Sequence, residues 1–167
     1  ISGPGPMTNV DPQAHWENVY RTKGEDEVSW VQESPAISLD LIAATGVRND
    51  ASIIDIGAGS SRLVDALLDQ GFENVTVLDL SEKALGTAKE RLGARASQVR
   101  WVVADVTRWE PSGAYHVWHD RAALHFLTDP LDREAYAERV AKAVRPRGHV
   151  IIGTFALDGP ERCSGLP

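Results

Sequence analysis

Short apolar runs alternate with helical patterns along most of the chain. Runs rich in Val, Ile and aromatic residues predict five buried strands, at residues 52–56, 75–78, 99–103, 115–118 and 149–155. The segments between most of these runs carry apolar residues at helical spacing. Strands that alternate with helices are typical of repeated βαβ units around a mainly parallel sheet. The pattern therefore predicts an α/β fold.

Capping residues mark the expected helix boundaries. The helix after the first strand should end at Gly71, and the helix after the second should run from a Ser81 cap to Gly93. Asp129-Pro130 should begin the last helix. The expected apolar face of the first of these helices is Leu63, Val64, Leu67 and Leu68. The expected face of the last is Leu131, Ala135, Tyr136, Val140 and Val144.

Two further helices are expected ahead of the sheet. The first covers residues 11–23, where Asp11-Pro12 suits an N-cap followed by a first-turn proline. The second begins at Ser34-Pro35 and stops at Gly46.

Composition narrows the class of protein. At 167 residues, with 43% hydrophobic and 25% charged residues, the chain suits one globular domain. Its net charge of -7 offers no general attraction for a phosphate backbone. This favours a small molecule or a protein side chain over nucleic acid as the substrate. No apolar run approaches the roughly 18 residues of a membrane span. The lone Cys163 forms no internal disulfide and fits a cytoplasmic location.

The segment after the first predicted strand has the chemistry of a nucleotide-binding loop. It reads Asp55-Ile56-Gly57-Ala58-Gly59-Ser60, where a strand feeds a helix whose N–H groups face a ligand. Arg62 stands where a dinucleotide fingerprint requires a third small residue, which disfavours a nicotinamide or flavin cofactor.

Two more carboxylates follow the next two strands. Asp79 stands 20 residues after Gly59, where such folds bind ribose hydroxyls, and Asp105 follows the third strand. A single Gly-x-Gly is more often a tight turn, and a single Asp is more often a helix cap. Together at the carboxyl ends of neighbouring strands, these residues predict one ligand site.

The chain resembles the class I S-adenosylmethionine-dependent methyltransferases, of the small thiopurine and lysine methyltransferase type. Four segments carry the resemblance in the family's order and spacing: residues 53–60, 77–81, 104–106 and 144–148. The resemblance implies a three-layer Rossmann-like sandwich with strand order 3-2-1-4-5. It also implies S-adenosylmethionine as methyl donor and S-adenosylhomocysteine as product.

The resemblance also assigns roles within the methyl-donor site. Gly57, Ala58 and Gly59 would pass under the methionine part, and Asp55 would orient this loop or bind the amino group through water. Asp79 with Leu80 would bind the ribose, and Asp105 with Val106 would frame the adenine. Trp16 and Tyr20, on a helix that covers the methyl donor in similar enzymes, would line the site.

The acceptor side is expected just after the fourth strand. His119 and Asp120 are the candidates for contacts to the methionine end or to the acceptor, while His125 is expected to pack on a helix and Asp120 also suits a helix cap. His116 and His119 stand three apart on a strand and point to opposite faces, so no metal site is expected.

The chain departs from the family after the fifth strand. Class I enzymes are expected to continue into a helix and a hairpin, whereas this chain ends at Pro167, shortly after Phe155. The edge of the fifth strand is therefore expected to be exposed and to mediate a homodimer. The expected organisation is a cloning remnant at residues 1–6, N-terminal helices over the methyl-donor site at 7–48, and the methyltransferase core at 49–167.

The leading hypothesis is a methyltransferase that acts on a small molecule or a protein side chain. The alternative is a non-catalytic S-adenosylmethionine-binding or regulatory protein with an incomplete acceptor pocket. A nucleotide-binding oxidoreductase is a third hypothesis, which Arg62 disfavours.

Overall fold

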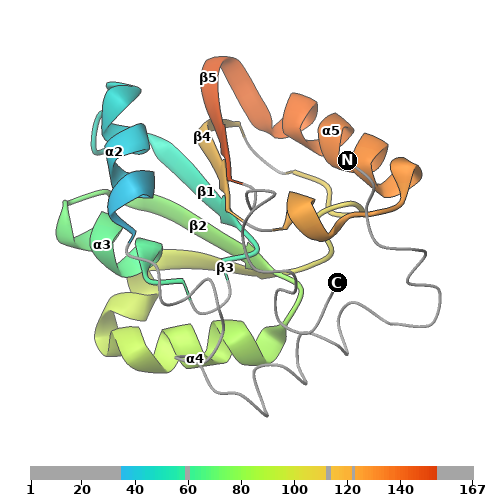
Figure 1. The fold of residues 1–167 in the computed structure, drawn as a ribbon. Coiled ribbons are helices and arrows are strands. Elements are labelled where there is room, and N and C mark those ends of the chain that lie inside the picture. Colours follow the sequence, from blue (N-terminus) through green and yellow to red (C-terminus); the bar gives the residue numbers. More distant parts are fainter. Residues whose placement is uncertain (1–34, 59–60, 112–113, 122, 154–167) are drawn as a thin grey trace.

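A five-stranded parallel sheet organises the chain (Figure 1). The structure, a computed structural model, describes residues 35–58, 61–111, 114–121 and 123–153. The strands are β1 (Ser52–Ile56), β2 (Asn74–Asp79), β3 (Val99–Val103), β4 (Tyr115–Asp120) and β5 (Val144–Ile152). Their order is β3-β2-β1-β4-β5, with every neighbouring pair parallel. The predicted fold class and strand order are confirmed.

Helices cover both faces of the sheet. They are α2 (Ala36–Ala44), α3 (Leu63–Asp69), α4 (Glu82–Leu92) and α5 (Pro130–Ala143), with short 3-10 helices η2 (Gly93–Gln98) and η3 (Leu124–Phe126). The helix expected at residues 11–23 lies outside the described ranges. Within those ranges, no helix combines the length and apolar character that a membrane crossing requires.

The core consists of one apolar cluster on each face of the sheet. Ile53 and Val117 belong to the cluster that α2, α3 and α4 cover, whereas Ile54 and Trp118 belong to the cluster under α5. Adjacent strand residues point to opposite faces, so each central strand supplies both clusters. Figure 1 shows this arrangement, with α2, α3 and α4 on one side of the sheet and α5 on the other.

The predicted helix caps are present. The Ser81 hydroxyl accepts a hydrogen bond from the Ala84 N–H at 3.2 Å, and the Asp129 carboxylate accepts one from the Leu131 N–H at 2.8 Å. Gly93 ends α4 with a φ of 61°, a left-handed conformation that favours glycine. These local signals placed both helix starts correctly.

Two expectations for the C-terminal part are wrong. Leu131, assigned to the buried face of α5, is 73% exposed, because it lies about 140° around the helix from the buried Tyr136. Val144 belongs to β5, not to the helix, and β5 begins five residues before the predicted start at 149. The pairing jumps from Tyr115–Val144 to Val117–His149, so this strand carries an irregularity that its sequence pattern does not show.

The two leucines Leu67 and Leu131 provide a direct test of the core. Leu67 is fully buried in the cluster under α3, and we expect Leu67→Ala to lower the free energy of unfolding by about 2–5 kcal/mol. Leu131→Ala removes the same atoms from an exposed site and should change the free energy of unfolding by less than about 0.5 kcal/mol. Urea unfolding of both variants measures the difference, and equal losses would contradict the assigned orientation of α5.

Candidate functional site

The loops that follow the strands are joined at the carboxyl edge of the sheet. The Gly57 N–H donates to the Leu78 carbonyl at 2.8 Å, and the Ala104 N–H donates to the Asp79 carbonyl at 3.0 Å. These bonds hold the ends of β1, β2 and β3 side by side. The residues predicted to bind the methyl donor after these strands therefore share one edge, the edge at which open α/β sheets bind ligands.

Gly57 is held in a conformation and a space that suit only glycine. Its φ is 63°, and a Cβ atom built on it would lie 2.9 Å from the Cβ of Ala123. The loop after β4 therefore packs directly on the glycine loop. Ala58 is buried beside it, and Gly59 lies outside the described residues.

Asp55 is the central polar residue on the face that α2 covers. Its Oδ1 lies 2.8 Å from Nδ1 of His119, whose Nε2 lies 2.9 Å from the Ser38 hydroxyl. Asp55 and His119 are each only 2% exposed. Asp55 Oδ2 is buried and has no hydrogen-bond partner among the described residues. Such an orphaned acceptor is costly and suits a cationic or N–H ligand group.

Asp79 ends β2 and is 7% exposed. Its Oδ1 accepts a hydrogen bond from the Ser81 N–H at 2.8 Å, which fixes the carboxylate at the start of α4. Leu80, between them, is half-buried. The side chain predicted to bind ribose is therefore held in place by its own turn.

Asp105 is held by the turn after β3. Its Oδ1 accepts hydrogen bonds from the Thr107 N–H at 2.9 Å and from the Thr107 hydroxyl at 2.6 Å. The Asp105 side chain is half-buried, whereas Val106 is buried in the cluster under α5. The two residues predicted to frame the adenine thus have different environments.

His119 and Asp120 do not form one constellation. They are successive residues of β4 and point to opposite faces of the sheet, so His119 contacts Asp55 and Ser38 while Asp120 lies under α5. The Asp120 carboxylate, fully buried, accepts hydrogen bonds from the Ala123 N–H at 2.7 Å and the Leu124 N–H at 3.0 Å. Asp120 thus accepts from N–H groups at the start of the 3-10 helix η3, in agreement with the cap that its sequence position suggests.

Tyr136 connects α5 to this cap. Its hydroxyl donates to Asp120 Oδ2 at 2.5 Å and accepts from the Trp118 indole N–H at 2.9 Å. Burial, followed by the negative charge of Asp120, raises the Tyr136 pKa far above its ordinary value. The periodicity of the sequence placed Tyr136 in the core but did not indicate this polar role.

His125 packs against its neighbour in η3. Its ring stands edge-on to Phe126, with ring centroids 5.2 Å apart. Burial and the nearby positive charge of Arg133 lower its pKa, so the neutral form is favoured. The packing role expected for His125 agrees with these contacts.

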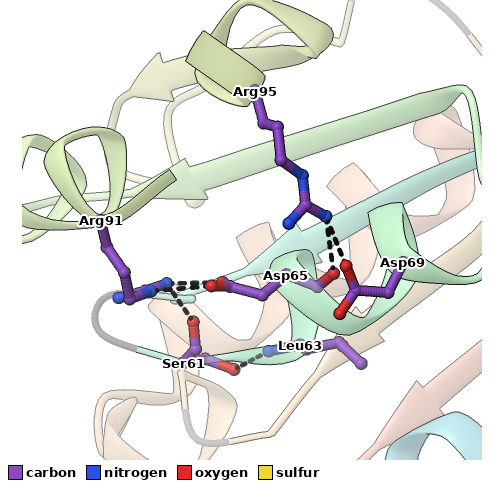
Figure 2. Close-up of polar contacts among 6 residues, drawn as sticks. All are labelled: Ser61, Leu63, Asp65, Asp69, Arg91 and Arg95. Carbon is purple, nitrogen blue, oxygen red and sulfur yellow. Dashed lines mark hydrogen bonds and ion pairs between the residues drawn. The ribbon is translucent and has the colours of Figure 1, made fainter. Parts of the chain in front are cut away.

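Ion pairs between helices hold the exit of the glycine loop (Figure 2). The Arg91 guanidinium binds both Asp65 oxygens, at 2.9 and 2.8 Å, and donates to the Ser61 carbonyl at 3.2 Å. The Ser61 hydroxyl in turn accepts from the Leu63 N–H at 3.1 Å at the start of α3. A bidentate arginine thus fixes the backbone that leaves the loop.

The described residues give no support for a ligand site at the opposite edge of the sheet or for a metal site. A hollow of about 320 Å³ lies at the opposite edge of the sheet, where β2 and β3 begin, lined by residues 73–75 and 97–100. Ligands of parallel α/β sheets bind at the other edge. Among the described residues, no three His, Cys, Asp or Glu side chains gather in a way that could hold a metal ion.

A five-stranded parallel sheet in this order, with a glycine loop and acids at its carboxyl edge, is a Rossmann-like fold. Residues 53–148 match the family described as Methyltransferase domain. The chain therefore belongs to the methyltransferase domain family.

Curated relatives act on different substrates. The chain is 25% identical over 139 residues to the mouse eEF1A lysine and N-terminal methyltransferase, a match that covers 82% of this chain and 19% of that protein. It is 26% identical over 156 residues to the ubiquinone biosynthesis O-methyltransferase of Aromatoleum aromaticum, covering 91% and 62%. The chain thus spans about a fifth of the first relative and less than two thirds of the second.

Solved structures with the same fold hold the methyl donor or its product. A Burkholderia thailandensis 1,6-didemethyltoxoflavin-N1-methyltransferase, with 1,6-didemethyltoxoflavin and S-adenosylhomocysteine bound, has a TM-score of 0.66 and 26% identity, covering 96% of this chain and 69% of that one. A glycopeptide N-methyltransferase with bound S-adenosylmethionine has a TM-score of 0.60 and 22% identity, covering 69% and 52%.

The raised pKa of Tyr136 predicts a loss of stability at high pH. Above the ordinary tyrosine pKa of 10.0, the unfolded chain releases this proton while the folded chain keeps it. Tyr136 should therefore lower the free energy of unfolding by about 1.4 kcal/mol per pH unit as the pH rises above 10. Tyr136→Phe removes that contribution, although it lowers the free energy of unfolding at neutral pH by about 1–3 kcal/mol. Urea unfolding between neutral and alkaline pH measures both effects, and parallel pH profiles would contradict the assignment.

Proposed function

We propose that this chain binds S-adenosylmethionine at the carboxyl edge of β1, β2 and β3 and transfers its methyl group to an acceptor. The observation that carries the proposal is the orphaned Oδ2 of Asp55, buried beside the glycine loop. The amino group of the methionine part is a cation that this oxygen could bind, directly or through water. The residues present therefore fit the methyl donor.

We assign each part of the methyl donor to residues at the carboxyl edge. Gly57, Ala58 and Gly59 would pass under the methionine part, because a glycine loop lets a ligand approach the backbone. The ribose hydroxyls would meet the carboxylate of Asp79 beside Leu80. The adenine would lie between Asp105 and Val106.

The N-terminal segment completes this proposal. We propose that residues 7–48 cover the methyl donor, with Trp16 and Tyr20 lining the site. The contact of Ser38 with His119 supports the proposed cover, because it brings α2 to the end of β4. Trp16 and Tyr20 lie outside the described residues.

The sulfonium of the methyl donor supplies an electrophilic methyl group, so the protein mainly has to align the two reactants. His119 and Asp120 are the candidates for contacts to the methionine end or to the acceptor. In the structure their polar atoms bind protein groups. We therefore propose that His119 holds Asp55 and that Asp120 holds Ala123, which packs on Gly57.

The acceptor is proposed to be a small molecule or a protein side chain. The named relatives include a methyltransferase for a protein and one for a small molecule, and the net charge of -7 disfavours nucleic acid. The lone Cys163 supports a cytoplasmic location as part of the same proposal.

Calorimetric titration tests the methyl-donor site. We expect binding of S-adenosylmethionine and S-adenosylhomocysteine and no binding of NAD. Gly57→Ala adds a methyl group against Ala123 and should weaken S-adenosylhomocysteine binding by about tenfold or more. Gly93→Ala is the matched control, because Gly93 has a φ of 61° and no atom within 4 Å of an added Cβ. Binding of NAD alone would contradict the proposal, and transfer of labelled methyl to an acceptor panel would separate an enzyme from a binding protein.

We also propose a homodimer through the outer edge of β5. Among the described residues β5 pairs only with β4, and Val150 and Ile152 are 44% and 39% exposed. An open apolar edge strand favours pairing with a second copy. We expect a dimer in light scattering that Val150→Lys dissociates, whereas Leu131→Lys, on the exposed side of α5, leaves it intact. A monomeric wild-type chain would contradict this assembly.

A further inference from the structure

A chain of three buried side chains joins helix α2 to the glycine loop. Ser38 binds Nε2 of His119 at 2.9 Å, and Nδ1 of His119 binds Oδ1 of Asp55 at 2.8 Å. Since the Asp55 carboxylate only accepts, Nδ1 carries the proton, and in the neutral ring Nε2 accepts from the Ser38 hydroxyl. Asp55 therefore sets the tautomer of His119, and the Ser38 hydroxyl, which can donate or accept, completes the chain at Nε2.

The two ends of this chain differ in how firmly they are attached. Asp55 and His119 are register partners in β1 and β4, so their contact is built into the sheet. Ser38 comes from α2, in which only Ser38 and Ile42 are buried while Ile37 is 72% exposed and Leu41 47% exposed. Two apolar side chains, the buried Ile42 and the partly buried Leu39, pack this helix on the core. The hydrogen bond of Ser38 is the polar contact that joins α2 to His119.

We infer that Ser38 is a positioning residue of the methyl-donor site, which acts through His119 on Asp55 and couples the seating of α2 to ligand binding. The hydrogen bond from His119 holds Oδ1 of Asp55, so that Oδ2 remains the free acceptor. The same order of groups activates serine nucleophiles in hydrolases. Here Ser38 is 8% exposed inside a helix, so it has little access to a substrate. This inference rests on the proposed function, because it requires a methyl donor at Asp55.

Three variants of the full chain distinguish an effect of the Ser38–His119–Asp55 hydrogen bonds from a general loss of stability. Ser38→Ala breaks the link to α2. His119→Asn keeps an N–H donor toward Asp55 Oδ1 but leaves no group within reach of Ser38. Thr45→Ala is the control, because the Thr45 hydroxyl donates to the Ile42 carbonyl and accepts from the Val47 N–H, and neither group belongs to the Ser38–His119–Asp55 chain.

Calorimetric titration with S-adenosylhomocysteine gives the first measurement. Ser38→Ala and His119→Asn should each weaken binding about fivefold to tenfold, the effect of one lost hydrogen bond. The double variant should lose no more than either single variant, because both changes break the same chain. Thr45→Ala should bind within about twofold of wild type, a difference smaller than one hydrogen bond is worth.

Hydrogen exchange of the α2 amides gives the second measurement. In the wild-type chain, S-adenosylhomocysteine should slow exchange in α2, and this protection should be lost in Ser38→Ala and in His119→Asn. Wild-type affinity in both variants, or an equal loss in Thr45→Ala, would overturn the inference and leave the proposed function intact. Failure of the wild-type chain to bind S-adenosylhomocysteine would overturn the proposed function and the inference with it. If Ser38→Ala does not fold, His119→Asn decides alone.

Discussion

The parallel register of β1 with its two neighbours is the constraint on which the site depends. Asp55 stands opposite Val77 of β2 and His119 of β4. A shift of one residue would move Asp55 to the face under α5 and separate it from His119. It would also move Gly57 away from Ala123. Such a shift is opposed because it would bury the Asp55 carboxylate in the apolar cluster under α5 without its hydrogen bond to His119.

Each face of the sheet contains one buried polar chain near its carboxyl edge. On one face His119 joins Ser38 to Asp55, and on the other Tyr136 joins Trp118 to Asp120. Buried polar groups are costly unless they are hydrogen-bonded, so these chains restrict how α2 and α5 can pack. Two successive residues of β4 thus position two different helices. Among the side-chain atoms of these two chains in the described residues, Oδ2 of Asp55 is the buried one without a hydrogen-bond partner, and it lies at the proposed methyl-donor site.

The ion pair between Arg91 and Asp65 lies outside the core and acts differently from the buried polar chains. Arg91 and Asp65 are 16% and 24% exposed, and ion pairs with access to solvent contribute little to the free energy of folding, about 0–1 kcal/mol. Their contribution here is geometric, because the same guanidinium also binds the Ser61 carbonyl at the exit of the glycine loop (Figure 2). The inner face of the loop is set by packing against Ala123.

The sequence by itself determined the α/β fold, the strand order implied by the family resemblance, most helix boundaries and the edge at which Asp55, Asp79 and Asp105 lie. These features follow from local periodicity, from caps and from the rule that parallel strands end at one edge. Only the tertiary structure decided that His119 belongs with Asp55 and Ser38, that Asp120 belongs with Tyr136, and that Leu131 faces solvent. Those outcomes depend on strand register and on the rotation of each packed helix, which relate residues far apart in the chain and leave no local pattern in it.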